Sequence, residues 1–479
     1  MLAARSQVAA ATVLCDLPLF CFTPQPLPGL RRGEHGEAQA PHIRVQYRAG
    51  LFMADDDNPP EIHWPDEING EKRAELRDAL VAYDQALTDL EADAAAVFSS
   101  DGERNGVFHS FLKRWDRAWS KPGSCMHDGC SNLSIPRSHT ISLGASIRLI
   151  ADNGHVQTPR YGAAGLDLVS VGVRDASTFP GFCTEHENLF SAFETQKTMT
   201  EEQHFRLQAF RTICREIYSK RHQKQKADAM LAEHRLRRNE FVIARMQSAR
   251  AAPPLEVSGL AFENDEIENR LVRHLADIQS DLPELEALYE GILPEIRHGS
   301  DHLAMLVANF GIQLSVCLSG FGVLNYERDG EAKRGLCFLA IIPESGNTKI
   351  MIGAASEHSD AIDLHAQDQS SFSVLEMLES WMIHGTDHWF IAPSAWSAIP
   401  AARQRAICER IMEPLSLADR SPFSILDDAR RQIIALAEAQ LAAGAIDATD
   451  RPAVERTLQE QRAKLDWMPK RSEPTTPAT

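Results

Sequence analysis

Five residues in this sequence carry the clearest chemistry, and four of them form two short clusters. Cys125 and Cys130 belong to the segment Cys-Met-His-Asp-Gly-Cys, Cys183 and His186 belong to Gly-Phe-Cys-Thr-Glu-His, and His139 lies between the two clusters. Thiolate sulfur and imidazole nitrogen are the ligands of closed tetrahedral zinc sites, which often join two close-spaced pairs across a loop. The spacing therefore predicts one structural Zn²⁺ ion bound by the three cysteines and a histidine. We expect His186 to be the fourth ligand, with His139 as the alternative.

Two other interpretations of these clusters are open on the residues alone. The side chains could be small buried groups of a core, or Cys125 and Cys130 could form a disulfide. Both clusters, however, lie among polar residues that are typical of turns. Four further cysteines lie in apolar or amphipathic stretches, which predicts core positions for Cys214, Cys317, Cys337 and Cys408. This contrast favours zinc for the two clusters.

Length and composition limit the class of protein. A chain of 479 residues allows two or three domains with their own cores. Its nine cysteines, odd in number and without framework spacing, indicate a reducing compartment, so we expect a cytoplasmic protein. No apolar run approaches the ~20 residues of a membrane span, and we expect no membrane partner. Met53 begins an acidic segment, which makes residues 1–52 an expected upstream extension of a chain that starts there.

Charge is unevenly distributed along the chain. The net charge is −18, yet residues 206–250 hold twelve Lys/Arg against four acids, a local balance of +8 that leaves −18 − 8 = −26 for the rest. Such a basic helix could contact the phosphate backbone of a nucleic acid, and Arg235, Arg237 and Arg238 are then the expected contacts. It could equally pair with the acidic segment 262–290 of the same chain. We favour the intramolecular pairing.

Hydrophobic periodicity, together with Gly and Pro positions, predicts an α+β fold. In it a small β-rich, treble-clef-like zinc module is flanked by long helices, followed by a second small β region and a helical C-terminal region. The expected segments are a disordered extension (1–58), a helical region (59–119), the zinc module (120–199), a long basic helix with antiparallel partner helices (200–300), a β region (301–360), a helical region (361–470) and a disordered tail (471–479).

Several elements are predicted with explicit bounds. Helices are expected over 69–97, 106–119, 200–251 and, as two pieces, 266–279 and 283–289. Strands are expected in the zinc module at 146–150 and 166–171, with Asp152-Asn153-Gly154 as a hairpin turn, and later at 312–318, 321–326, 336–342 and 348–353. A turn is expected at 344–347, and helices resume from Ser373, including 407–411 and 425–441.

The order of motifs between residues 120 and 220 is similar to that of a group of uncharacterised bacterial proteins. It comprises Cys-x4-Cys, Ser-His-Thr-Ile, a hairpin, and Gly-Phe-Cys-x2-His-Glu-Asn-Leu-Phe. More distantly it resembles the treble-clef module of HNH endonucleases. That resemblance implies that the zinc is structural and that His139 is a general base activating water. It also implies that Asn188 or Glu187 binds a catalytic Mg²⁺ or Mn²⁺.

One more histidine pair was considered as a metal site. His384 and His388 have the i, i+4 spacing of zincins, but glycine stands where the zincin glutamate would be. The surrounding aromatic residues favour a packed helix end. The sequence thus predicts a zinc-binding protein whose zinc module and basic helix bind nucleic acid or a protein. The alternative is an HNH-like metal-dependent endonuclease, in which His139 would be the base rather than a ligand or a neighbour of the zinc.

Overall fold

The computed structural model describes residues 100–162, 165–248, 265–299, 302–366, 370–413 and 419–469, with Leu417 and short pieces between residues 70 and 98. The segments expected to be disordered, 1–58 and 471–479, lie outside the described residues. The chain divides into two compact units. The first comprises Met1–Asp16, Arg117–Lys224 and Ala276–Thr479, and the second comprises Leu17–Asp116 and Gln225–Leu275. Mixed helix and sheet agree with the predicted α+β class.

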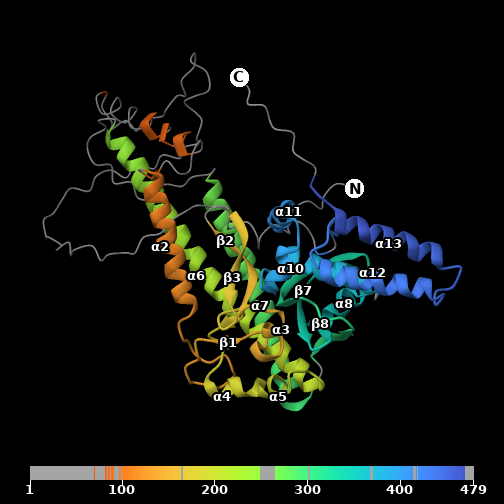
Figure 1. Cartoon of the computed structure of the whole chain (residues 1–479). Helices are drawn as coiled ribbons and strands as arrows, with labels where there is room; N and C mark the ends of the chain where they lie inside the picture. Colours follow the sequence, from red (N-terminus) through yellow and green to blue (C-terminus); the bar gives the residue numbers. More distant parts are fainter. Residues whose placement is uncertain are drawn as a thin grey trace, which may run out of the picture. The chain divides into compact units, whose positions relative to one another are not determined.

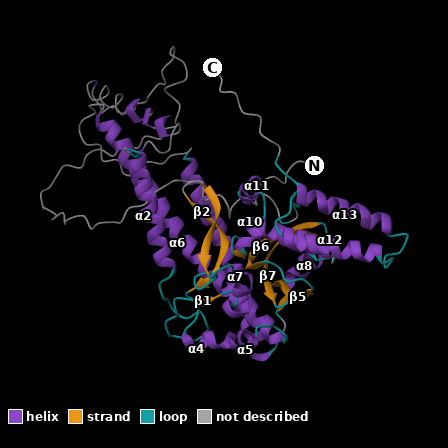
Figure 2. Ribbon diagram, viewed as in Figure 1, coloured by secondary structure: helices purple, strands orange, loops and turns teal. Residues whose placement is uncertain are grey.

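A seven-stranded antiparallel sheet forms the centre of the first unit (Figures 1 and 2). Its strands, in spatial order, are β3 (Gly165–Gly172), β2 (His155–Gly162), β9 (Trp389–Ile391), β6 (Val316–Arg328), β7 (Glu331–Glu344), β8 (Asn347–Ala355) and β5 (Leu303–Phe310). The prediction of two separate β regions was therefore wrong. The three-residue strand β9 joins them, because Gln157 of β2 and Val316 of β6 both pair with Ile391.

The later strands were largely predicted. The pieces expected at 312–318 and 321–326 form the single strand β6, and the expected turn lies between β7 and β8, where Glu344 pairs with Asn347. Gly346 has φ +81° there, a conformation that glycine adopts without strain. Strands β5 and β9 were missed. Strand β7 ends in ten consecutive buried residues, because both faces of the sheet are covered there. This burial explains why its sequence is apolar and does not alternate with polar residues.

The sheet separates two hydrophobic layers. Alternate residues of β7 face opposite sides, so that Leu339 and Ile341 belong to one core and Phe338 and Ala340 to the other. The first core is shared with the C-terminal helices. These are α8 (Ser359–His365), α9 (Ser371–Ser380), α10 (Pro393–Ser397), α11 (Ala401–Ile411), α12 (Asp427–Ala442) and α13 (Arg451–Asp466), with the single π-turn Trp381–Gly385 after α9. The second core is shared with residues 125–199 and two long helices.

The strand predicted at 146–150 was wrong, because this segment is helical. A π-turn (Leu143–Ile147) runs into α3 (Arg148–Ile150), and Ser142 caps it by accepting a hydrogen bond from the Ala145 N–H. The turn at Asn153 and Gly154 has positive φ, as expected, but it leads from α3 into β2 instead of joining two long strands. The hairpin of this region is β2–β3.

Two long helices run antiparallel. Helix α6 (Glu202–Ser248) is the predicted basic helix, and α7 (Glu266–His298) is its partner. Near one end Gln203 donates to the Ile296 carbonyl, and further along Lys220 forms a 2.8 Å ion pair with Asp281. The break predicted in α7 between 279 and 283 was wrong. Although Pro283 removes a backbone hydrogen bond, burial of the apolar face that follows it maintains the helix. Helix α2 (Asp101–Trp119) includes the predicted 106–119, and the few described residues at 81–90 are helical within the predicted 69–97.

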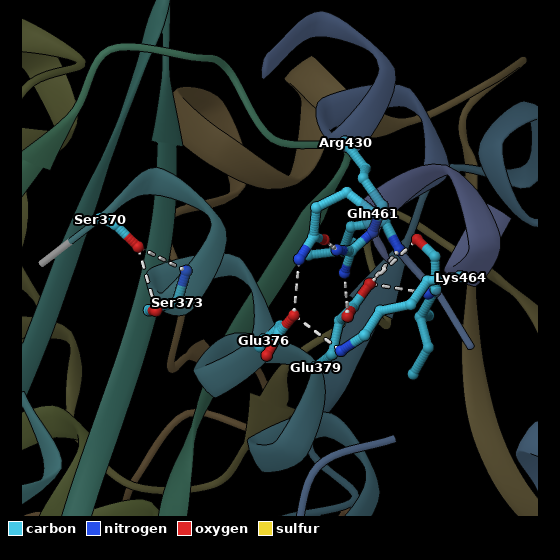
Figure 3. Close-up of polar contacts among 10 residues, drawn as sticks. Ser370, Ser373, Glu376, Glu379, Arg430, Gln461 and Lys464 are labelled. Atoms are coloured by element: carbon cyan, nitrogen blue, oxygen red, sulfur yellow. Dashed lines mark hydrogen bonds and ion pairs between the residues drawn. The ribbon is translucent and has the colours of Figure 1, made fainter. Parts of the chain in front are cut away.

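Buried ion pairs hold the C-terminal helices together (Figure 3). Glu379 of α9 and Arg430 of α12 form a 2.5 Å ion pair, and their side chains are 2% and 0% exposed. Gln461 of α13 bonds Arg430 and also donates to Glu376 at 2.9 Å, and Lys464 pairs with Glu376 at 2.6 Å. Because a buried charge without its partner is costly, this network fixes the packing of α13 against α9 and α12. Within the described parts of the chain, no helix has the length and apolar character to cross a membrane.

Candidate metal centre

A tight loop positions the first ligand pair. Residues 123–134 fold back on themselves, with an antiparallel bridge between Ser124 and Leu133 and a hydrogen bond from the Cys125 N–H to the Asn132 carbonyl. At its tip the Cys130 N–H donates to the His127 carbonyl, and Gly129 adopts φ +73°. This turn brings the sulfur of Cys130 back toward that of Cys125, which is why the Asp-Gly sequence lies between the two cysteines.

The second ligand pair lies at the start of a short helix. Cys183 is the N-cap of α4 (Thr184–Glu187), and His186 lies in its single turn. Two backbone hydrogen bonds join this segment to the first loop, from Met126 to the Gly181 carbonyl at 2.8 Å and from Ile135 to the Phe182 carbonyl at 2.7 Å. The Cys183 N–H also donates to the Cys125 sulfur at 3.3 Å. The backbone thus places both pairs face to face.

The four predicted ligands converge on one point. One ligand atom from each of Cys125, Cys130, Cys183 and His186 lies within 4.8 Å of the other three. His186 Nδ1 is 3.5 Å from Cys125 Sγ and 3.3 Å from Cys183 Sγ, and the sulfurs of Cys130 and Cys183 are 3.9 Å apart. Across the described residues this is the one group of three or more such side chains that could hold a metal ion. His186 and not His139 completes the group, as predicted.

The sulfurs differ in their acidity. Burial raises the pKa of Cys125 to about 11. Burial acts in the same direction on Cys183, but hydrogen bonds from the backbone and side chain of His186 outweigh it and lower its pKa to about 6. Cys183 is therefore ready to bind as a thiolate near neutral pH, whereas Cys125 must lose its proton when a metal binds. All seven cysteines in the described part of the chain are free, so the disulfide alternative for Cys125 and Cys130 was wrong.

Aromatic residues pack next to the segments that contain the four candidate ligands. Phe182, next to a ligand, contacts Phe190 and Phe210 with ring centroids 5.0 and 5.5 Å apart. Tyr289 of α7 donates from its hydroxyl to the Met126 carbonyl inside the first loop. The ligand loops thus rest on the core shared with α6 and α7. Of the other cysteines expected in the core, Cys214 and Cys317 are buried in this second core, and Cys337 and Cys408 are buried in the first.

His139 lies outside the ligand group. It belongs to the two-residue strand β1 (Ser138–His139), which pairs with β4 (Thr178–Phe179). Burial, with a contribution from the Arg211 guanidinium, lowers its pKa to about 4, so the ring is neutral at pH 7. Its Nε2 atom is buried and has no hydrogen-bond partner.

Of the two residues expected as alternative ligands of a catalytic metal, Asn188 and Glu187, the side chain of Glu187 faces a cation of the chain itself. Glu187 Oε1 is 3.6 Å from the Arg211 guanidinium, which also pairs with Glu194 at 2.8 Å and lies 3.8 Å above the ring of Phe190. Arg211 is fully buried. Sequence reasoning missed this residue. The available signal was an arginine that directly follows Phe210 and lies close to Ile213 and Cys214, since a buried arginine is unusual unless it is paired.

The three arginines expected to contact nucleic acid are paired with carboxylates of their own unit. Arg238 is 2.5 Å from Asp265 and 2.6 Å from Glu268, and Arg235 is 2.5 Å from Glu268. Arg237 pairs with Glu233 and Glu103. Arg237 and Arg238 are buried, and the favoured pairing with the acidic segment is observed for Arg235 and Arg238. The described part of the 262–290 segment supplies the partners of Arg235 and Arg238, whereas those of Arg237 lie outside this segment.

The rejected histidine pair is structural. His388 is buried, and its Nδ1 lies 2.6 Å from the Ser319 carbonyl. His384 lies in the π-turn after α9, with Nε2 buried. Neither histidine belongs to the Cys/His group described above.

No protein-family model matches this chain, and searches of curated proteins and of solved structures give no significant match.

Proposed function

We propose that this chain is a zinc-dependent binding protein in which Cys125, Cys130, Cys183 and His186 hold a structural Zn²⁺. The convergence of the four ligand atoms within 4.8 Å carries the proposal. Three sulfurs and one imidazole nitrogen match the preference of zinc for soft and borderline ligands in tetrahedral sites. Because the protein supplies all four ligands, no coordination position is left for a substrate, and this favours a structural over a catalytic role.

The arrangement of the ligands supports a treble-clef-like module. One pair comes from a tight loop and the other from the first turn of α4, as in the modules that the sequence resembles. A metal at this point would link residues 123–135 to residues 181–190. Since Glu187 and Glu194 follow the second pair and bind Arg211 of α6, the link would extend to the long helix.

The partner that we propose is a protein. The arginines of α6 that would attract phosphate are neutralised by Asp265, Glu268 and Glu233, and the chain as a whole is strongly acidic. Both features disfavour the electrostatic attraction on which nucleic-acid binding depends. The nuclease alternative has less support, because Glu187 faces Arg211 and the Nε2 atom of His139 is buried.

Elemental analysis of protein purified without chelator tests the zinc proposal directly. We expect about one Zn²⁺ per chain, as one four-ligand site requires. Less than roughly a tenth of an equivalent would refute the proposal, because closed zinc sites of this type bind with about 10 kcal/mol or more.

The variant His139→Ala separates the structural role from the nuclease alternative. We expect it to retain zinc like the wild type, since His139 is not among the four converging ligands. Neither protein should cleave DNA or RNA with Mg²⁺ or Mn²⁺. Cleavage by the wild type that is lost in His139→Ala, at unchanged zinc content, would instead establish the HNH-type reaction.

A further inference from the structure

The candidate ligand His186 lies face to face with a second histidine. The ring of His127 stacks on the ring of His186, with the two centroids 3.8 Å apart and the planes only 6° from parallel. Both residues are half-buried. His127 lies in the first ligand loop, between Cys125 and Cys130, and is not one of the four converging ligands. The ligand group alone therefore gives this close contact no role.

A histidine ligand needs a second contact that sets the direction of its ring. The last side-chain torsion of histidine is broad, so the ring can turn its nitrogens away from a metal at little cost. In most metal sites the nitrogen that does not bind the metal donates to a carboxylate, a carbonyl or a water, and this hydrogen bond fixes the ring. Within the described parts of the chain, the hydrogen-bonding contacts of the His186 ring are those of Nδ1 with the sulfurs of Cys125 and Cys183, and Nε2 has no protein acceptor.

Stacking can replace the missing hydrogen bond. A separation of 3.8 Å is close to the optimal distance between the faces of two rings. Rotation of the His186 ring about its last torsion would drive the ring edge into His127, so the parallel orientation is the one that both rings can share. In this orientation Nδ1 of His186 lies 3.3 Å from the sulfur of Cys183 and 3.5 Å from that of Cys125.

The ring of His127 is itself held in place. Its edge faces Phe210 of α6, with ring centroids 6.3 Å apart and planes at 82°. Its Nδ1 atom lies 3.1 Å from the carbonyl oxygen of Asp128, and the preceding residue Met126 accepts a hydrogen bond from the Tyr289 hydroxyl of α7. A ring that is fixed by both helices can fix the ring stacked on it.

We propose that His127 is a positioning residue of the metal centre, whose ring holds the ring of His186 with Nδ1 directed at the ion. The inference rests on the proposed zinc binding and adds a residue that acts through a ligand. His127 contributes a flat surface and not a ligand atom. Any flat ring at this position should therefore serve, whereas a side chain without a ring should not.

Zinc affinity, measured on the full chain by competition with a chelator, tests this role. His127→Ala should bind Zn²⁺ about 10–100-fold more weakly than the wild type, the usual effect of losing a residue that supports a metal ligand. His127→Phe should recover most of the affinity, because it keeps a flat ring without a nitrogen. His127→Asn keeps a hydrogen-bonding side chain without a ring and should behave like His127→Ala.

The substitution His155→Ala is the matched control. Like His127, His155 has its Nδ1 atom close to the carbonyl oxygen of a nearby residue, here Asn153 at 3.0 Å. It belongs to β2 and is not part of the ligand group. Its removal should leave the zinc affinity unchanged.

Absorption spectra of the Co²⁺-loaded proteins provide a second readout, because the d–d bands of Co²⁺ depend on its ligands and their geometry. The wild type and His127→Phe should share one spectrum, that of a tetrahedral site with three sulfurs and one nitrogen. At saturating Co²⁺, His127→Ala should give shifted bands, since the imidazole is no longer held toward the ion.

The outcomes separate the positioning role from the zinc proposal. Equal zinc affinity of the wild type and His127→Ala overturns the positioning role and leaves the zinc proposal intact. A loss in His127→Phe as large as that in His127→Ala also overturns it, because His127 would then act through a nitrogen or through folding alone. Wild-type protein that binds no zinc overturns the zinc proposal, and the positioning role with it.

Discussion

The substitution Cys183→Ser tests the metal centre most sharply. Serine is nearly isosteric with cysteine, so the aromatic packing around residue 183 should persist while one ligand is lost. Structural zinc sites contribute about 10–16 kcal/mol of binding free energy in small finger domains. An equal share among four ligands is about 3 kcal/mol, which corresponds to roughly a hundredfold weaker zinc affinity.

The structure also predicts which residues should lose order in Cys183→Ser. The ligand loops are held independently by the hydrogen bonds from Met126 to Gly181 and from Ile135 to Phe182, and by the buried core beneath them. We therefore expect local loss of order in residues 123–135 and 181–190, and not global unfolding. Limited proteolysis should cut first in these two segments.

A matched control separates ligand loss from the cost of a buried hydroxyl. Cys214 is fully buried in the same core but is not one of the converging ligands. Cys214→Ser should lower the free energy of unfolding by about 1–3 kcal/mol, the cost of a buried polar group without a partner. It should nevertheless retain zinc against a competing chelator. The reasoning is refuted if Cys183→Ser holds zinc as tightly as the wild type, or if both variants lose it alike.

Three further outcomes follow from buried charges and histidines. Burial lowers the pKa of His365 to about 4 from 6.5, so the unfolded chain binds more protons between these values. Stability should then fall as pH drops from about 6.5 toward 4, by up to ~1.4 kcal/mol per pH unit for this group, and His365→Gln should flatten the slope of thermal melts measured across that range. Arg238→Glu should lower the free energy of unfolding by about 3–5 kcal/mol, because it places a carboxylate against Asp265. An unchanged melting temperature together with loss of measurable DNA binding would instead support the nucleic-acid interpretation. Arg430→Met should lower the free energy of unfolding by a similar ~3–5 kcal/mol, and adding Glu379→Gln should recover part of this loss in a double-mutant cycle. Strict additivity of the two effects would show that the pair is not coupled.

Local patterns in the sequence were enough to select the four residues that converge at the candidate metal centre. Cysteine and histidine in polar, turn-forming surroundings differ from cysteine in apolar stretches, and this local contrast correctly separated Cys125, Cys130 and Cys183 from Cys214. It also indicated the long helices, since α6 contains neither glycine nor proline. These features depend on residues close together in the chain, so local patterns suffice to predict them.

Tertiary structure alone decided how the parts combine. Trp389–Ile391 is too short to be recognised as a strand, yet its pairing with β2 and β6 turns two predicted β regions into one sheet. Segment 146–150 has the apolar character of a strand, but it is helical, and Ile147 and Ile150 pack into the second core.

Tertiary structure also determines the role of the charged side chains, because that role depends on which side chains they contact. The sequence shows that α6 is basic, but only packing against Asp265 and Glu268 determines that Arg238 is neutralised within its own unit. Likewise, only the fold shows that Arg211 occupies the place beside Glu187 where a catalytic cation was expected. The type of a side chain limits the chemistry available to it, and its partners select which chemistry is realised. These partners come from distant parts of the chain. They cannot be read from the sequence because electrostatic energies depend on separation and burial and not on sequence position.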